Sequence, residues 1–229
     1  MRPKSFLAIL NLLAALVAGA AAAQGFKFSN PPDPSIQAEE EARQQRIAQQ
    51  LSTPCRAELS GKKIMVMIGE MQSNGVVSAQ QQNYGPHFQA INSRLRWLGL
   101  KTYTPEEIRK QIAQAEIDAY FRNDPNAMLA AAKRLVAWFE LRGLITSQAI
   151  QNPLMPVNQV SVNMGFTLAA SNGRIISDQS AHAASYAGAD VSSMALTLVN
   201  EQADEVVANL YADYCNNAGI PAGNKSAPK

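Results

Sequence analysis

Histidine and cysteine are scarce in this chain of 229 residues, which contains two of each. A zinc site needs three or four ligands, usually with Cys or His in closely spaced pairs. His87 and His182 are isolated, and neither cysteine has a second Cys or His at ligand spacing. The chain also lacks a P-loop and a G-x-G-x-x-G motif. We therefore expect no metal site and no cofactor.

A charge excess of one sign is also absent. The chain has 20 Lys and Arg residues against 18 Asp and Glu residues, and the two signs are interspersed. A basic stripe for nucleic acid and a polybasic patch for a membrane surface are both missing. No segment after residue 23 is apolar enough to span a bilayer. The sequence therefore predicts no nucleic-acid partner and no membrane span once a signal peptide is removed.

The first 23 residues have the pattern of a secretory signal peptide. Arg2 and Lys4 precede an apolar run over residues 6–20, and three alanines at 21–23 form a cleavage site. A retained anchor helix is the alternative, but the apolar run is short for a span of about 20 residues. No cysteine lies at the junction itself, so lipidation is not expected. The pattern predicts cleavage after Ala23 and a periplasmic location.

The two cysteines are Cys55 and Cys215, and both lie beyond the predicted cleavage site. An even pair in an exported protein is typical of a disulfide. A reactive or metal-binding pair is the alternative. We predict one α/β domain over residues 55–215, closed by a Cys55–Cys215 disulfide.

Tails flank this predicted domain. Residues 24–54 are poor in core residues, and a Gln/Glu/Arg-rich stretch over 35–51 is interpreted as a mobile extension or a partner-binding helix. Residues 216–229 are rich in Gly, Pro, Asn and Lys, and we expect a disordered tail there.

The segment 157–188 predicts the central hairpin of the domain. Its first half alternates apolar and polar residues from Val160 to Leu168, which indicates a strand with one buried face. Ser171-Asn172-Gly173 then supplies residues that tolerate positive φ, as a tight turn needs. A second, more polar strand returns from Arg174 towards Tyr186.

The other elements complete an α/β (α+β) fold. Lys62–Ile68 is a short apolar run typical of a strand buried on both faces. Three helices are predicted to begin near Pro86, Thr104 and Asp124, the second with a capping box. A strand over residues 138–145 and a last helix down to Cys215 follow. We expect a small mixed sheet of about four strands with helices packed on it, in the order β-α-α-α-β-β-β-α.

Three polar residues share one face of the returning strand: Asp178, Ser180 and His182. Residues two apart on a strand lie about 6–7 Å from each other, which is too far for a Ser-His-Asp triad without rotation. No G-x-S-x-G elbow is present either. We interpret these residues as a solvent-facing polar strand, with Asp178 and His182 as candidate binding residues.

Glu70 is the third candidate, because it is expected in a polar loop directly after a central strand, where α/β folds place ligand-binding loops. A solvated loop carboxylate is the alternative. Glu70 and Glu140 are the strand-associated carboxylates that glycoside cleavage would need, although nothing in the sequence sets their distance. His87, at a helix start, is interpreted as a satisfied surface residue. No catalytic residue is assigned.

Three stretches resemble a group of bacterial envelope domains. They are KKIMVMIGE (62–70), FELRGLITS (139–147), and VNQVSVNMGFTL (157–168) followed by GRIISDQSAHAASYAG (173–188). The group includes the amino-terminal domain of TolB, lipoprotein activators of penicillin-binding proteins, the curli secretion lipoprotein and the middle domain of a flagellar assembly protein. The resemblance covers roughly residues 60–215. This chain lacks the lipobox cysteine of the lipoprotein members.

The resemblance implies a non-enzymatic domain that docks onto other envelope proteins or assembles into rings. We expect a periplasmic accessory or assembly factor, with envelope proteins or further copies of itself as partners. The alternatives are a periplasmic enzyme acting on envelope polymer, for which two or more of the candidate groups must converge in a pocket, and a subunit of a homo-oligomeric secretion ring.

Overall fold

The computed structural model describes residues 34–71, 77–79, 85–122, 124–151, 157–187 and 190–219. The predicted signal peptide and residues 220–229 lie outside the described residues. The chain divides into two units, residues 1–39 and residues 40–229, and the fold below is that of the second unit. No helix in the described part of the chain is long and apolar enough to cross a membrane.

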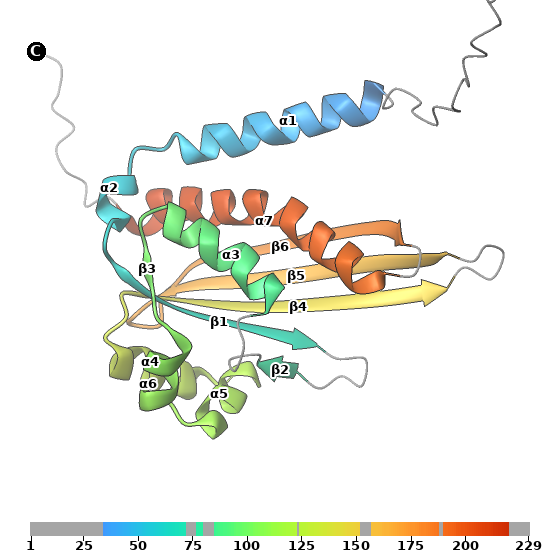
Figure 1. Cartoon of the computed structure of the whole chain (residues 1–229). Helices are drawn as coiled ribbons and strands as arrows, with labels where there is room; N and C mark the ends of the chain where they lie inside the picture. The colour runs from blue at the N-terminus through green and yellow to red at the C-terminus, as the bar shows by residue number, and fades with distance from the viewer. Residues whose placement is uncertain are drawn as a thin grey trace, which may run out of the picture. The chain divides into compact units, whose positions relative to one another are not determined.

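A mixed sheet with the strand order β2-β1-β4-β5-β6 forms the centre of the fold (Figure 1). β1 runs parallel to β4, the other neighbours in this order are antiparallel, and β3 pairs with β1 in parallel. The strands are β1 Lys63–Met71, β2 Val77–Ala79, β3 Lys101–Thr102, β4 Phe139–Gln151, β5 Asn158–Ala170 and β6 Ile175–Ala187. The four long strands confirm the predicted mixed sheet. β2 and β3 were not predicted, because two or three residues are too few to show a periodic pattern.

The helices and turns are α1 Pro34–Leu51, α2 Arg56–Leu59, α3 Pro86–Trp97, α4 Pro105–Gln111, α5 Gln114–Phe121, α6 Pro125–Leu135 and α7 Val191–Tyr214, followed by a π-helical turn over Cys215–Gly219. The capping box of α4 is confirmed: the Glu107 amide donates to Thr104 Oγ1 at 3.2 Å, and the Thr104 amide donates to the Glu107 carboxylate at 2.8 Å. The prediction of one helix after Thr104 was wrong. Ile112 adopts an extended conformation (φ −123°, ψ 123°) and separates α4 from α5.

Hydrophobic cores lie on both faces of β1, as predicted. Ile64, Val66 and Ile68 face the larger core, which includes residues of α3 and α7. Met65 and Met67 face a smaller core with residues of α4, α5 and α6. Figure 1 shows α3 and α7 across one side of the sheet, and α4 to α6 grouped on the other side near β1. We call these the α7 face and the opposite face.

A disulfide joins Cys55 to Cys215 with a Cα–Cα distance of 5.7 Å, so the predicted pairing is present. It links the segment before α2 to the end of α7 across 160 residues of sequence. The hydroxyl of Tyr211 reinforces this link, because it donates to the Thr53 carbonyl and accepts from the Cys55 amide.

The second part of α1 packs on α7. Ile47 is buried, Arg46 forms an ion pair with Glu205 at 3.1 Å, and the Gln50 amide donates to Asn209. Residues 40–51 are thus helical and contact α7 of the same chain, whereas the interpretation of residues 35–51 as a partner-binding helix stays a prediction. The sequence showed only scattered apolar residues here because this contact combines one buried apolar residue, Ile47, with polar pairs to α7.

Candidate functional site on the open face of the sheet

The opposite face of β5 and β6 is exposed to solvent. Apolar residues of β5, from Val160 to Leu168, point into the larger core below α7. Between them, Asn163 and Gly165 are exposed, and so are Asp178, Ser180 and His182 on β6. We call this exposed side of β4, β5 and β6 the open face. The prediction that Asp178, Ser180 and His182 form a solvent-facing polar strand is confirmed.

One row of the open face carries a charge at each end. Arg142 of β4 is in register with Thr167 of β5, which is in register with Asp178 of β6. Neighbouring strands lie about 4.8 Å apart, so a guanidinium, a hydroxyl and a carboxylate group cross three strands in a line. They line a depression of about 390 Å³ together with Phe121 and Ser180.

Arg142 is a site residue that the sequence reasoning missed. Its signal was present, because it is the one cation of β4 and follows Leu141 on the alternate face. What could not be read from the sequence is the register that aligns it with Asp178, 36 positions later.

His182 lies next to Asn163 in the strand register. Its Nδ1 is 2.8 Å from Asn163 Oδ1. An amide oxygen can only accept, so Nδ1 carries a proton and Nε2 is left for another partner. Asp178 and His182 are four residues apart on one strand, about 13 Å, so they do not form a catalytic pair within one chain.

Glu70 lies on the α7 face, away from Asp178 and His182. It follows Ile64, Val66 and Ile68 in the alternation of β1 and is in register with Ile145, which is also in the larger core. The expectation that Glu70 sits in a loop was wrong, since β1 continues to Met71 and pairs there with β2. The three candidate residues therefore do not converge.

His87, at the start of α3, is the partner of Glu70, with 2.9 Å between His87 Nδ1 and Glu70 Oε1. Both side chains are mostly buried. The interpretation of His87 as a satisfied residue fits this pair, although its partner is the Glu70 carboxylate rather than solvent.

Glu140 lies on the opposite face of β4, between the positions of two residues of the larger core, Phe139 and Leu141. Only 2% of Glu140 is exposed, and its Oε2 has no hydrogen-bond partner. Desolvation raises the pKa of Glu140 to about 7. Because Glu70 and Glu140 point to opposite faces of the sheet, they cannot act as the paired carboxylates of a glycosidase.

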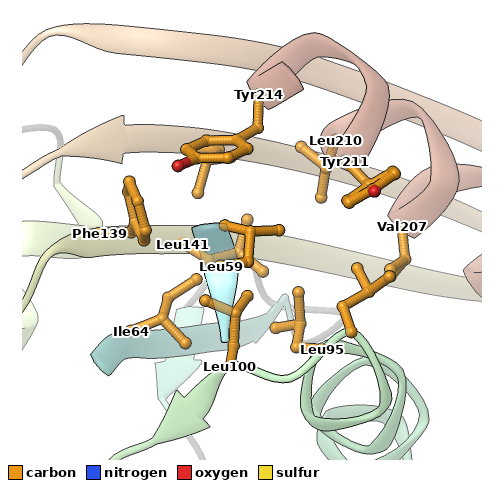
Figure 2. Close-up of a pocket in the computed structure, with 12 residues that line it drawn as sticks. Leu59, Ile64, Leu95, Leu100, Phe139, Leu141, Val207, Leu210, Tyr211 and Tyr214 are labelled. Carbon is orange, nitrogen blue, oxygen red and sulfur yellow. The ribbon is translucent and has the colours of Figure 1, made fainter. Parts of the chain in front are cut away.

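A cavity of about 20 Å³ lies in the larger core, where Leu141, Leu210 and Tyr214 are among the side chains that close around it (Figure 2). That volume accommodates about one water molecule and no organic ligand. Within the described part of the chain, no group of three or more His, Cys, Asp or Glu residues could hold a metal ion.

No protein family matches the chain, and no curated protein matches its sequence. Solved structures are similar to it at low identity. A hypothetical protein, CT253, from Chlamydia trachomatis is 13% identical, with a TM-score of 0.45, over 69% of this chain and 97% of that chain. Lipoprotein GNA1162 from Neisseria meningitidis is 14% identical, with a TM-score of 0.44, over 63% and 97%.

The C-terminal domain of LpoB from Salmonella enterica is 12% identical, with a TM-score of 0.39, over 62% of this chain and 94% of that chain. Similarity at this level carries no inference about function.

Proposed function

We propose that this chain is a periplasmic, non-enzymatic accessory or assembly factor that docks onto other envelope proteins through the open face of its sheet. The observation that carries the proposal is the cross-strand row of Arg142, Thr167 and Asp178 on an exposed surface. The signal-peptide pattern and the Cys55–Cys215 disulfide support an exported protein.

A row with a cation at one end and an anion at the other suits recognition of a protein surface. Opposite charges at fixed spacing orient a partner and penalise a wrongly placed one. The depression around the row is lined by hydroxyl and amide groups besides the two charged groups. This lining contains no assembled pair of nucleophile and base. These features favour docking over turnover.

The enzyme alternative requires Glu70, Asp178 or His182 to converge with a second reactive group. In the described residues, Glu70 lies on the α7 face, whereas Asp178 and His182 lie on the open face about 13 Å apart. This arrangement offers no support for the enzyme alternative.

The test is crosslinking and affinity capture in the periplasm with the mature chain and with two open-face variants, Arg142→Glu and Thr167→Lys. We expect both variants to lose the envelope proteins that the unchanged chain captures. Arg96→Glu is the matched control for Arg142→Glu, because Arg96 is exposed on α3, remote from the open face, and the charge change is the same.

Circular dichroism of each variant confirms that it is folded. Capture of the same proteins by folded open-face variants would contradict docking at this face. Turnover of envelope polymer that is lost on changing Glu70, Asp178 or His182 would overturn the non-enzymatic assignment.

A further inference from the structure

β6 is the last strand in the sheet order and pairs on one side only, with β5. Its 13 residues make an edge about 40 Å long. At its beginning, the side chain of Asn217 donates to the Ile176 carbonyl at 3.5 Å. From Ser177 onward, no described strand or helix supplies a backbone partner on the outer side.

This edge lacks the usual features that prevent strand pairing. Natural edges are kept apart by lysine, proline, bulges or short length. β6 contains no Lys, Arg or Pro, and its one irregularity lies at the turn end, opposite Leu168 and Ala169. At the other side of the sheet, the outer strands β2 and β3 have only three and two residues. Among the described outer strands, β6 thus has the long, regular edge.

The charges of β6 are arranged symmetrically. Asp178 is its only carboxylate and His182 its only imidazole, and both are exposed on the open face. Asp178 lies two residues before Ser180, and His182 lies two residues after it. If two copies of β6 pair antiparallel around Ser180, Asp178 of each copy lies opposite His182 of the other, and this occurs twice.

We propose that β6 pairs antiparallel with β6 of a second copy of this chain, centred on Ser180, to form a twofold-symmetric dimer with a continuous sheet. A twofold contact requires a self-complementary surface, and the Asp178–His182 spacing provides it. The residues between them, Gln179, Ser180 and Ala181, have no bulky branched or aromatic group that would hold the edges apart.

The hydrogen bond between His182 and Asn163 orients the imidazole ring for this contact. Asn163 Oδ1 binds the Nδ1 proton, so Nε2 is the nitrogen available to the second copy. When His182 is protonated, its Nε2–H donates to the carboxylate of Asp178 in the second copy. Directly opposed residues on antiparallel strands have Cβ atoms about 5 Å apart, which is within reach of this bond.

The axis of such a dimer is perpendicular to the sheet, so the open faces of both copies lie on the same side. The rows of Arg142, Thr167 and Asp178 then belong to one extended surface. The inference extends the proposed docking function but does not depend on it, because the oligomeric state is measured without an envelope partner.

The first experiment measures the dimer dissociation constant of the mature chain by sedimentation velocity. Asp178→Lys removes the carboxylate that His182 of the second copy would bind, and His182→Asp places two carboxylates opposite each other; each is expected to weaken the dimer by about tenfold or more. The double variant Asp178→Lys/His182→Asp restores opposite charges and is expected to recover most of the affinity. Glu41→Lys, exposed on α1, is the charge-matched control and should leave the dimer unchanged.

The second experiment tests the register by oxidative crosslinking of Ser180→Cys. Opposed residues have Cα atoms about 4.5–5.5 Å apart, within the range that a disulfide spans, so rapid crosslinking is expected. Ala184→Cys is the control, because in this register its two copies are displaced by about 26 Å.

A chain that stays monomeric at hundreds of micromolar would overturn the proposal. A dimer would also overturn it if Asp178→Lys and His182→Asp left it intact, or if Ser180→Cys crosslinked no faster than Ala184→Cys. Capture of the same envelope proteins by folded Arg142→Glu and Thr167→Lys variants, with an intact dimer, would instead contradict only the docking function.

Discussion

The carboxylate of Glu70 and the imidazole of His87 are joined at 2.9 Å, one at the end of β1 and the other at the start of α3. Both groups are mostly buried, so the pair connects the strand to the helix away from bulk water. A hydrogen bond to a charged group contributes about 1.5–3 kcal/mol, and removing one partner leaves the other without a partner for that bond.

We expect His87→Ala and Glu70→Gln each to lower the free energy of unfolding by about 1–2 kcal/mol. The double variant should lose less than the sum, because the second change removes a group that has already lost this partner. Urea unfolding of the four proteins measures the coupling. Strict additivity would show that the two side chains do not stabilise each other.

Gly143 allows the ring of Phe166 to lie against the backbone of β4. A Cβ atom at position 143 would be 2.4 Å from a carbon of that ring, well below contact distance. We expect Gly143→Ala to destabilise the protein by about 1–3 kcal/mol and Phe166→Leu to relieve part of this loss in the double variant. Thermal unfolding provides the measurement.

Gly165 is the matched control for this prediction. It lies on the neighbouring strand, and a Cβ atom there would have no neighbour within 4 Å. Gly165→Ala should leave stability unchanged or raise it slightly. If both alanine variants behaved alike, the close approach of Phe166 to Gly143 would not limit residue choice.

Glu140 should make stability depend on pH. Burial raises its pKa from 4.5 to about 7, so the folded state holds this proton more tightly than the unfolded state. Its contribution is complete below pH 4.5 and is lost as the pH rises through about 7, a decrease of about 3 kcal/mol in the free energy of unfolding. Glu140→Gln keeps the shape of the side chain without this charge.

Urea unfolding between pH 4.5 and 8 tests the prediction. Glu140→Gln should flatten the decline and be more stable than the unchanged chain at pH 8. Glu41→Gln changes an exposed carboxylate of α1 and should preserve the decline. A decline that persists in Glu140→Gln would assign the pH dependence to another group.

The disulfide should contribute a large share of the stability. It closes a loop of 160 residues, for which the chain-entropy relation gives about 5 kcal/mol. We expect Cys55→Ala/Cys215→Ala to lower the free energy of unfolding by about 4–5 kcal/mol, measured against denaturant. A reductant should destabilise the unchanged chain to a similar level and have no effect on the double variant, whereas equal stability of all forms would contradict the prediction.

The long strands and the last helix were predictable because their residues repeat over many positions. The alternation from Val160 to Leu168 indicated which face of β5 is buried, and the same rule placed Asp178 and His182 on the exposed face of β6. The capping residues of α4 and the cysteine pair were equally readable, since a short motif or an even count is sufficient to indicate each of them.

Contacts between distant segments were decided only by the tertiary structure. The register that aligns Arg142 with Thr167 and Asp178, the pairing of Glu70 with His87 and the packing of α1 on α7 all join elements that no local pattern relates. The exposed edge of β6 likewise depends on strand order. The repeat of apolar residues indicates which side of a helix or strand is buried, because it follows the pitch of that element's own backbone. Which elements lie next to each other depends instead on how the whole core packs.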